Sequence, residues 1–126
     1  MLPVHELSVC QALLTQVAEI AAGRGARVVE RITIEVGPLS GVEPALLASA
    51  FAIVRAGGCA AEATLLIEST TVTIGCMACG AHSQTEPNRL VCAVCGGFRT
   101  RVVAGDELRL RRVELRMPES RSGPAA

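Results

Sequence analysis

The sequence predicts an α+β fold, in which two helices pack on a three-stranded sheet and a small metal-stabilised module is inserted before the last strand. Helix-like and strand-like spacings of apolar residues alternate over the first 69 residues, two Cys-x-x-Cys pairs follow, and one more strand comes after them. If that strand returns to the sheet begun near Arg27, the cysteine-containing segment is an insertion. We therefore expect a discontinuous domain of residues 1–69 and 106–116, and an inserted domain of residues 70–105.

Two segments have the periodicity of amphipathic helices. From Glu6 to about Ala22, apolar residues recur at spacings of three and four, and Gly23-Arg24-Gly25 supplies the stop. The second helix begins at Glu43-Pro44, where proline occupies a first-turn position, and ends before Gly57-Gly58. Its expected buried stripe consists of Leu46, Leu47, Ala50, Phe51 and Val54.

The strands are predicted from period-two alternation. In Arg27–Val36 the apolar face is expected to hold Val28, Ile32, Ile34 and Val36, and the wet face Val29, Arg31, Thr33 and Glu35. Further strands are expected at 64–69 (running on through 70–74), 98–103 and 107–116. The alternation in the last strand slips at Arg111-Arg112, which predicts a bulge. The polar segment 80–89 is predicted to be a loop and 117–126 a disordered tail.

The two Cys-x-x-Cys pairs predict a zinc ribbon. Cys76 and Cys79 are separated from Cys92 and Cys95 by twelve residues, and each pair is followed by glycine. This spacing can bring four thiolates to one tetrahedral point, and glycine allows the tight turn that aims amide groups at the sulfurs. Four protein ligands close the coordination sphere, so the zinc is expected to be structural.

Redox chemistry and disulfides are the alternatives for these cysteines. A thioredoxin-like pair opens a helix, yet the residues after Cys79 and Cys95 begin no periodic helix. The N-terminus has neither a basic region nor a signal-type cleavage site, so we expect a cytoplasmic protein with reduced thiols. Cys10 and Cys59, which have no partner at ligand spacing, are expected to be buried apolar residues.

Composition narrows the functional classes. The formal net charge is zero. Half of the residues are apolar, and they include two Phe but no Trp or Tyr. Residues 1–98 contain five Arg and eight Glu, whereas residues 99–126 contain seven Arg and four acidic residues. A nucleic-acid-binding protein is expected to combine a net basic face with aromatic side chains that stack on bases. This chain lacks such aromatic residues. The longest apolar run is too short to span a bilayer, so no membrane partner is expected.

A family resemblance rests on three groups of residues: His5-Glu6-Leu7-Ser8 opening a helix, Glu35-Val36-Gly37 with Leu39-Ser40-Gly41 after the first strand, and the paired Cys-x-x-Cys-Gly motifs. From about Val4 to Leu115 the chain resembles HypA/HybF-type hydrogenase nickel-incorporation proteins. The resemblance implies a nickel metallochaperone that works with a HypB-type GTPase to load nickel into the large subunit of [NiFe] hydrogenase. It also implies that Ni(II) binds at the N-terminus through His5 and Glu6.

The chemistry of a nickel site at His5 depends on the residues before it. Ni(II) suits square-planar nitrogen coordination, and a histidine in second position can supply its imidazole, its own amide and the terminal amine, with the next residue's amide completing the plane. The printed sequence departs from this pattern, because it starts Met1-Leu2-Pro3-Val4 and a proline nitrogen cannot become an amide ligand. We expect translation to start at Val4, read as initiator methionine.

Three functional classes remain open from the sequence. A metallochaperone fits the absence of any catalytic constellation or phosphate-binding loop, so no enzymatic activity is expected. A zinc-ribbon module that binds nucleic acid or the transcription machinery is the second, supported by the Arg-rich last strand. A thiol oxidoreductase is the third. We expect a monomer or weak homodimer, and a solvent-exposed His82.

Overall fold

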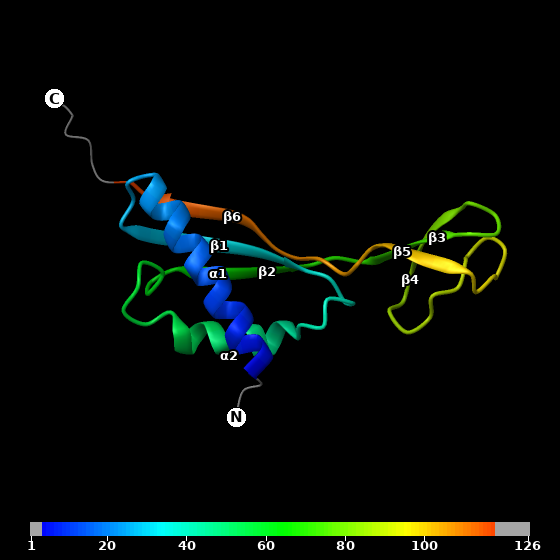
Figure 1. Cartoon of the computed structure of the whole chain (residues 1–126), viewed down its shortest axis with the longest axis horizontal. Helices are drawn as coiled ribbons and strands as arrows, with labels where there is room; N and C mark the ends of the chain where they lie inside the picture. The colour runs from blue at the N-terminus through cyan, green and yellow to red at the C-terminus, as the bar shows by residue number, and fades with distance from the viewer. Residues whose placement is uncertain (1–3, 118–126) are drawn as a thin grey trace. The chain divides into compact units, whose positions relative to one another are not determined.

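The computed structural model describes residues 4–117 and confirms the α+β class (Figure 1). Met1–Pro3 and the predicted tail from residue 118 lie outside the described residues. The elements are α1 (Val4–Gly23), β1 (Val28–Val36), α2 (Pro44–Val54), β2 (Thr64–Ser69), β3 (Val72–Cys76), β4 (His82–Thr85), β5 (Thr100–Ala104) and β6 (Leu108–Arg116). No helix within 4–117 is long and apolar enough to cross a membrane.

The chain divides into two compact units. One contains the residues up to Thr33, Ala45–Leu66 and the residues from Leu110 onward; the other contains Ile34–Pro44 and Ile67–Arg109. The predicted domain boundaries at 69/70 and 105/106 stay a prediction.

Both helices bury part of the apolar stripe that their spacing predicts, whereas Leu46 and Val54 of α2 are half-buried and Ile20 of α1 is exposed. α1 buries Cys10, Val17 and Ala21, and α2 buries Leu47, Ala50 and Phe51. The end of α1 is fixed by the Ala26 amide, which donates to the Ala21 carbonyl at 2.9 Å, while Gly25 takes a φ of +71°. This pairing closes the helix in the way that a left-handed glycine allows.

The first sheet has the order β2-β1-β6, with β1 in the centre. Ile32, Ile34 and Val36 are buried as predicted. The expectation that Val29 and Thr33 face solvent is wrong, since both are buried. Glu30 and Arg31 are consecutive exposed residues that interrupt the alternation after Val29, and a central strand packs side chains on both faces.

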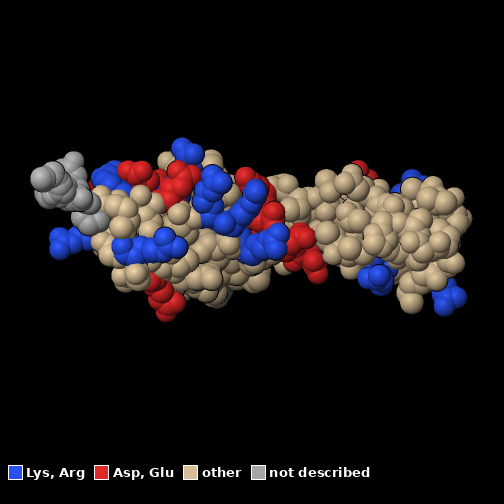
Figure 2. Space-filling model, turned by 90° about the horizontal axis from the view of Figure 1, so that it is seen from above, with Lys and Arg blue, Asp and Glu red and all other residues tan. Residues whose placement is uncertain are grey.

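Exposed arginines of β6 pair with acids of the neighbouring β1. Arg109 Nε lies 2.6 Å from Glu35 Oε1, and Arg116 Nε lies 2.8 Å from Glu30 Oε2. Figure 2 shows acidic and basic side chains interleaved on one face of the molecule. Such exposed pairs contribute little stability, but they neutralise much of the Arg-rich strand on which the nucleic-acid alternative depends.

The second sheet has the order β4-β3-β5 and forms the ribbon. β4 pairs antiparallel with β3, from Val72 opposite Thr85 to Gly75 opposite His82. The prediction of a loop over 80–89 is therefore wrong for His82–Thr85. This polar segment has no apolar alternation of its own and becomes a strand because β3 supplies its pairing partner.

Two glycines allow a close backbone approach where strands leave the ribbon. A Cβ on Gly37 would lie 2.2 Å from the Gly105 carbonyl oxygen, and a Cβ on Gly105 would lie 2.8 Å from Val72 Cα. The Gly37 amide donates to the Glu107 carbonyl and the Leu39 amide to the Gly105 carbonyl, both at 2.7 Å. The loop after β1 is thereby fixed against the segment that leads into β6.

The Glu107 carboxylate reinforces this junction. It accepts hydrogen bonds from Thr70 Oγ1 at 2.8 Å and from the Gly105 amide at 3.1 Å. The hydrogen bond from Thr70, followed by those from backbone amides, lowers the pKa of Glu107. Sequence reasoning did not single out Glu107, because its partners lie far apart in the chain.

Candidate metal centre

The four predicted zinc ligands come together at one point. The sulfur atoms of Cys76, Cys79, Cys92 and Cys95 all lie within 4.8 Å of one another, and all four are free thiols. The Cys76–Cys95 and Cys79–Cys92 sulfur pairs are each 3.6 Å apart. Tetrahedral zinc with Zn–S bonds of about 2.3 Å separates sulfurs by about 3.8 Å. The donor set and its spacing therefore fit a closed four-thiolate zinc site.

The two knuckles, residues 76–80 and 92–96, repeat one backbone design. In the first, the amides of Ala78 and Cys79 both donate to Cys76 Sγ at 3.4 Å. In the second, the amides of Val94 and Cys95 donate to Cys92 Sγ at the same distance. Amides aimed at a sulfur favour its thiolate form, which is the form that binds metal.

The glycine after each pair completes its knuckle. Gly80 and Gly96 have φ of +79° and +75°, and their amides donate to the carbonyls of Cys76 and Cys92 at 3.0 and 2.9 Å. A side chain in this left-handed region is strained, whereas glycine adopts it readily. The sequence-based role of the two glycines is thus seen directly in the backbone.

The electrostatics of each knuckle favour one thiolate in particular. The amide of Cys95, and after it that of Val94, lowers the pKa of Cys92 to about 6. The amides of Cys79 and Ala78 likewise lower the pKa of Cys76. Cys76 and Cys92 are also the buried members of their pairs, while Cys79 and Cys95 are exposed. The ribbon therefore presents two thiols with pKa values below the ordinary range.

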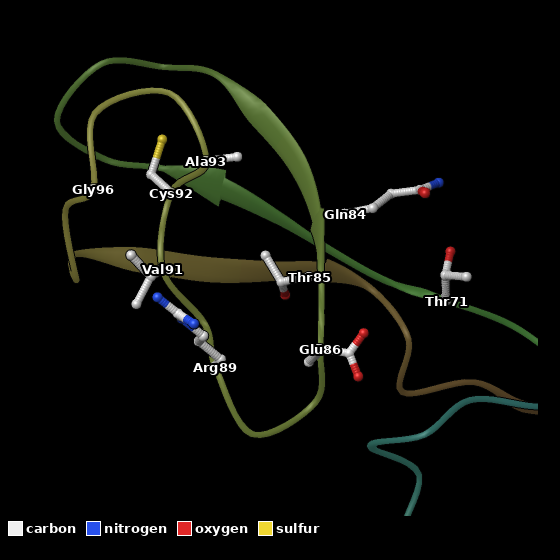
Figure 3. A pocket seen from close by; sticks show the side chains of 9 residues that line it. All are labelled: Thr71, Gln84, Thr85, Glu86, Arg89, Val91, Cys92, Ala93 and Gly96. Atoms are coloured by element: carbon white, nitrogen blue, oxygen red, sulfur yellow. The ribbon is translucent and has the colours of Figure 1, made fainter.

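A hollow of about 680 Å³ lies beside the second knuckle (Figure 3). Polar side chains, including Gln84, Glu86 and Arg89, line much of it, and Cys92 is part of its wall. Figure 3 shows the Cys92 sulfur directed away from Arg89 and Glu86. The buried Thr85 Oγ1 in its wall has no hydrogen-bond partner among residues 4–117.

His5 and Glu6 lie in the first turn of α1 but have different surroundings. The His5 side chain is exposed, whereas Glu6 is buried with 4% of its surface exposed. The two side chains thus differ in burial, and their joint role in nickel binding stays a prediction. Their backbone amides are adjacent, at the helix end where amides have no intrahelical acceptor.

The remaining cysteines and the second histidine lie outside the thiol cluster. Cys10 is buried, and burial raises its pKa to about 11, which makes it an unreactive core residue. Cys59 is only half-buried, less than expected, and its carbonyl accepts from the Val29 amide. His82 is exposed, as predicted.

Comparison with known proteins identifies the family to which the chain belongs. The family model described as "Hydrogenase/urease nickel incorporation, metallochaperone, hypA" matches residues 4–115. The chain belongs to the HypA family. HypA of Nitrosospira multiformis, a hydrogenase maturation factor, is 45% identical over 112 residues, which cover 89% of this chain and 97% of the relative. HypA of Aquifex aeolicus is 37% identical over the same shares of the two chains.

Solved HypA structures share the fold. The solution structure of the nickel metallochaperone HypA from Helicobacter pylori superimposes with a TM-score of 0.66 at 26% identity, over 90% of this chain and 98% of that one. A second HypA solution structure gives a TM-score of 0.70 at 27% identity, over 92% and 99% of the two chains. The predicted family and its α+β fold are confirmed.

Proposed function

We propose that this chain is a nickel metallochaperone that binds Ni(II) at its N-terminus and helps to deliver it into the large subunit of [NiFe] hydrogenase. The observation that carries the proposal is the HypA family match over residues 4–115, which includes His5, Glu6 and all four clustered cysteines. The relatives named hydrogenase maturation factor support the same role.

The proposed nickel site uses the first turn of α1. The exposed imidazole of His5 and the backbone nitrogens of His5 and Glu6 supply three of the nitrogen donors that Ni(II) prefers. Amides in a first helical turn have no intrahelical acceptor, so their deprotonation and metal binding break no helix hydrogen bond. Glu6 itself is buried at this turn, and the fourth donor is the terminal amine of a chain that starts at residue 4.

In this proposal the zinc bound by Cys76, Cys79, Cys92 and Cys95 is structural. When bound, zinc cross-links the two knuckles, and four protein ligands leave no open position for substrate. The chain is then a carrier without catalytic activity. Its proposed partners are a HypB-type GTPase and the hydrogenase large subunit, in the cytoplasm and without nucleic acid or membrane, with the chain acting as a monomer or weak homodimer.

Nickel titration of two purified forms tests the proposal. One form begins at Met1 and the other at an initiator methionine followed directly by His5, and each is made with and without His5→Ala. Calorimetry is expected to show tight nickel binding only by the shorter form that retains His5, while zinc content stays the same in all four. Equal nickel binding by all four samples would exclude the N-terminal site.

The start of the native chain can be measured separately. Mass spectrometry of the protein from its own organism is expected to find residue 4 as the initiator methionine. Active protein that retains Met1-Leu2-Pro3 would contradict this part of the proposal.

A further inference from the structure

The ribbon exposes apolar side chains on both faces of β5 and at the adjoining first knuckle. Met77 and Phe98 expose 63% and 83% of their surface, and Val102 and Val103 expose 36% and 42%. The Met77 amide donates to the Arg99 carbonyl at 2.7 Å, which places Met77 beside the segment leading into β5. We refer to Met77, Phe98, Arg99, Arg101, Val102 and Val103 as the β5 edge surface.

β5 lies at an open edge of its sheet. Within the described residues its single neighbour is β3, in the order β4-β3-β5. Three consecutive residues, Arg101 to Val103, are exposed, and because side chains alternate along a strand, both faces of β5 are uncovered. An edge strand with apolar side chains and free backbone groups is a template for another strand.

The β5 edge surface is held in a fixed shape by the ribbon. β5 pairs with β3 from Thr73 opposite Ala104 to Cys76 opposite Thr100. The first residue of β5 therefore lies opposite Cys76, a zinc-ligand candidate. Thr100 Oγ1 also donates to the Leu90 carbonyl at 2.9 Å. The surface is therefore ordered before any partner arrives, which lowers the entropy lost on binding.

The charges on β5 and on the segment leading into it are positive, and the acids Asp106 and Glu107 follow the end of β5, where Thr70 and the Gly105 amide hold the Glu107 carboxylate. Arg99 and Arg101 lie on the segment itself, while Glu86, the one acid in residues 70–105, follows the opposite edge strand β4. A strand added to β5 thus meets arginines and apolar side chains. Complementarity calls for carboxylates alternating with apolar residues.

We propose that the β5 edge surface binds an extended acidic and apolar segment of a partner protein, which adds to the ribbon sheet as a strand beside β5. Backbone hydrogen bonds to β5 supply affinity. Pairing of its carboxylates with Arg99 and Arg101, and packing of its apolar side chains on Phe98 and Val103, supply selectivity. The proposal requires a metal-loaded ribbon but not the N-terminal nickel site.

Fluorescence anisotropy with two blocked seven-residue peptides tests the inference on the zinc-loaded full chain. One peptide alternates glutamate with valine and the other lysine with valine. We expect saturable binding of the glutamate peptide and about tenfold weaker binding of the lysine peptide. Failure of both peptides to bind saturably, or equal affinity for both, overturns the proposal.

Variants locate the binding surface. Reversing charge with Arg99→Glu and Arg101→Glu together is expected to invert the peptide preference, and Phe98→Ser to weaken glutamate-peptide binding about tenfold. Ile53→Ser, on the exposed apolar Ile53 of α2, is the matched control and is expected to change nothing. Unchanged preference in the charge-reversed protein overturns the proposal, as does displacement of the peptide by a single-stranded oligonucleotide that binds more tightly.

Zinc content, measured on every sample, separates failure of this surface from failure of the metal site. If the charge-reversed double variant loses zinc, Val103→Glu takes its place, because it leaves both arginines and changes only an exposed side chain. Val103→Glu is expected to weaken the glutamate peptide by like-charge repulsion while the lysine peptide gains. An unchanged preference in this variant overturns the proposal equally.

Discussion

Gly37→Ala is expected to be among the most destabilising single substitutions in the described chain. The new Cβ would lie 2.2 Å from the Gly105 carbonyl oxygen, 2.4 Å from its carbon and 2.8 Å from the Glu107 amide nitrogen. All three are backbone atoms, so no side chain can rotate away to make room. The two backbone segments must separate, and the hydrogen bonds from Gly37 to Glu107 and from Leu39 to Gly105 are then lost or lengthened.

The expected cost follows from these contacts. Each backbone hydrogen bond contributes about 1 kcal/mol net, and forcing an extra carbon into a packed site costs about 1–3 kcal/mol. Together they lower the free energy of unfolding by about 3–5 kcal/mol. This is a large share of the roughly 5–15 kcal/mol that keeps a typical domain folded.

Urea unfolding of the zinc-loaded protein, followed by circular dichroism, measures this loss. Gly23→Ala is the matched control, since a Cβ there meets nothing within 4 Å and Gly23 ends a helix. The control is expected to leave stability unchanged or raise it by up to about 1 kcal/mol. A Gly37→Ala protein as stable as the control would show that the Gly37–Gly105 approach is not required.

Three further predictions concern the metal centre and its support. Cys79→Ser should lose the bound zinc and the structure of the ribbon, measured as zinc content and circular dichroism; full zinc retention would contradict the four-thiolate site. Val94→Pro removes an amide that lowers the Cys92 pKa, so zinc affinity should fall about tenfold and acid-induced zinc release shift to higher pH, whereas Val94→Ala should behave as the wild type. Glu107→Gln should lower the free energy of unfolding at neutral pH. Because the pKa of Glu107 is lower in the folded protein than in the unfolded chain, its carboxylate stabilises the fold at pH values above the unfolded pKa. This stabilisation is lost as the pH falls through the folded-state pKa, so the difference between the variant and the wild type should vanish in acid. A constant difference from pH 7 down to about 3 would refute the last prediction.

Local signals in the sequence predicted the elements they encode. For α1, the predicted start lies two residues from the observed one and the predicted end one residue away. Both ends are set by neighbouring residues in the chain, namely the three-and-four apolar spacing and the glycines that stop the helix. The cysteine spacing brought the right four sulfurs together for the same reason: each knuckle is a local turn, and its glycine fixes the backbone.

Features that depend on distant partners could not be predicted. The strand at His82–Thr85 forms because β3 pairs with it, and nothing in its own polar residues favours a strand. The burial of Val29 likewise depends on the central position of β1, which is a property of the assembled sheet. His5 is the opposite case: it lies one residue before the predicted start of the helix, spacing gives it no ligand partner, and its role rests on the family.

The composition of the ribbon explains why its surface is unusual. Within residues 70–105 the buried apolar side chains are Val72, Ile74, Cys76 and Cys92, so two of the four are themselves zinc-ligand candidates. A core this small supplies little free energy, and metal binding must supply much of the rest. A module stabilised through metal has less need to bury its other apolar side chains. Phe98 can therefore remain on the surface of a folded ribbon, where it is available to a partner.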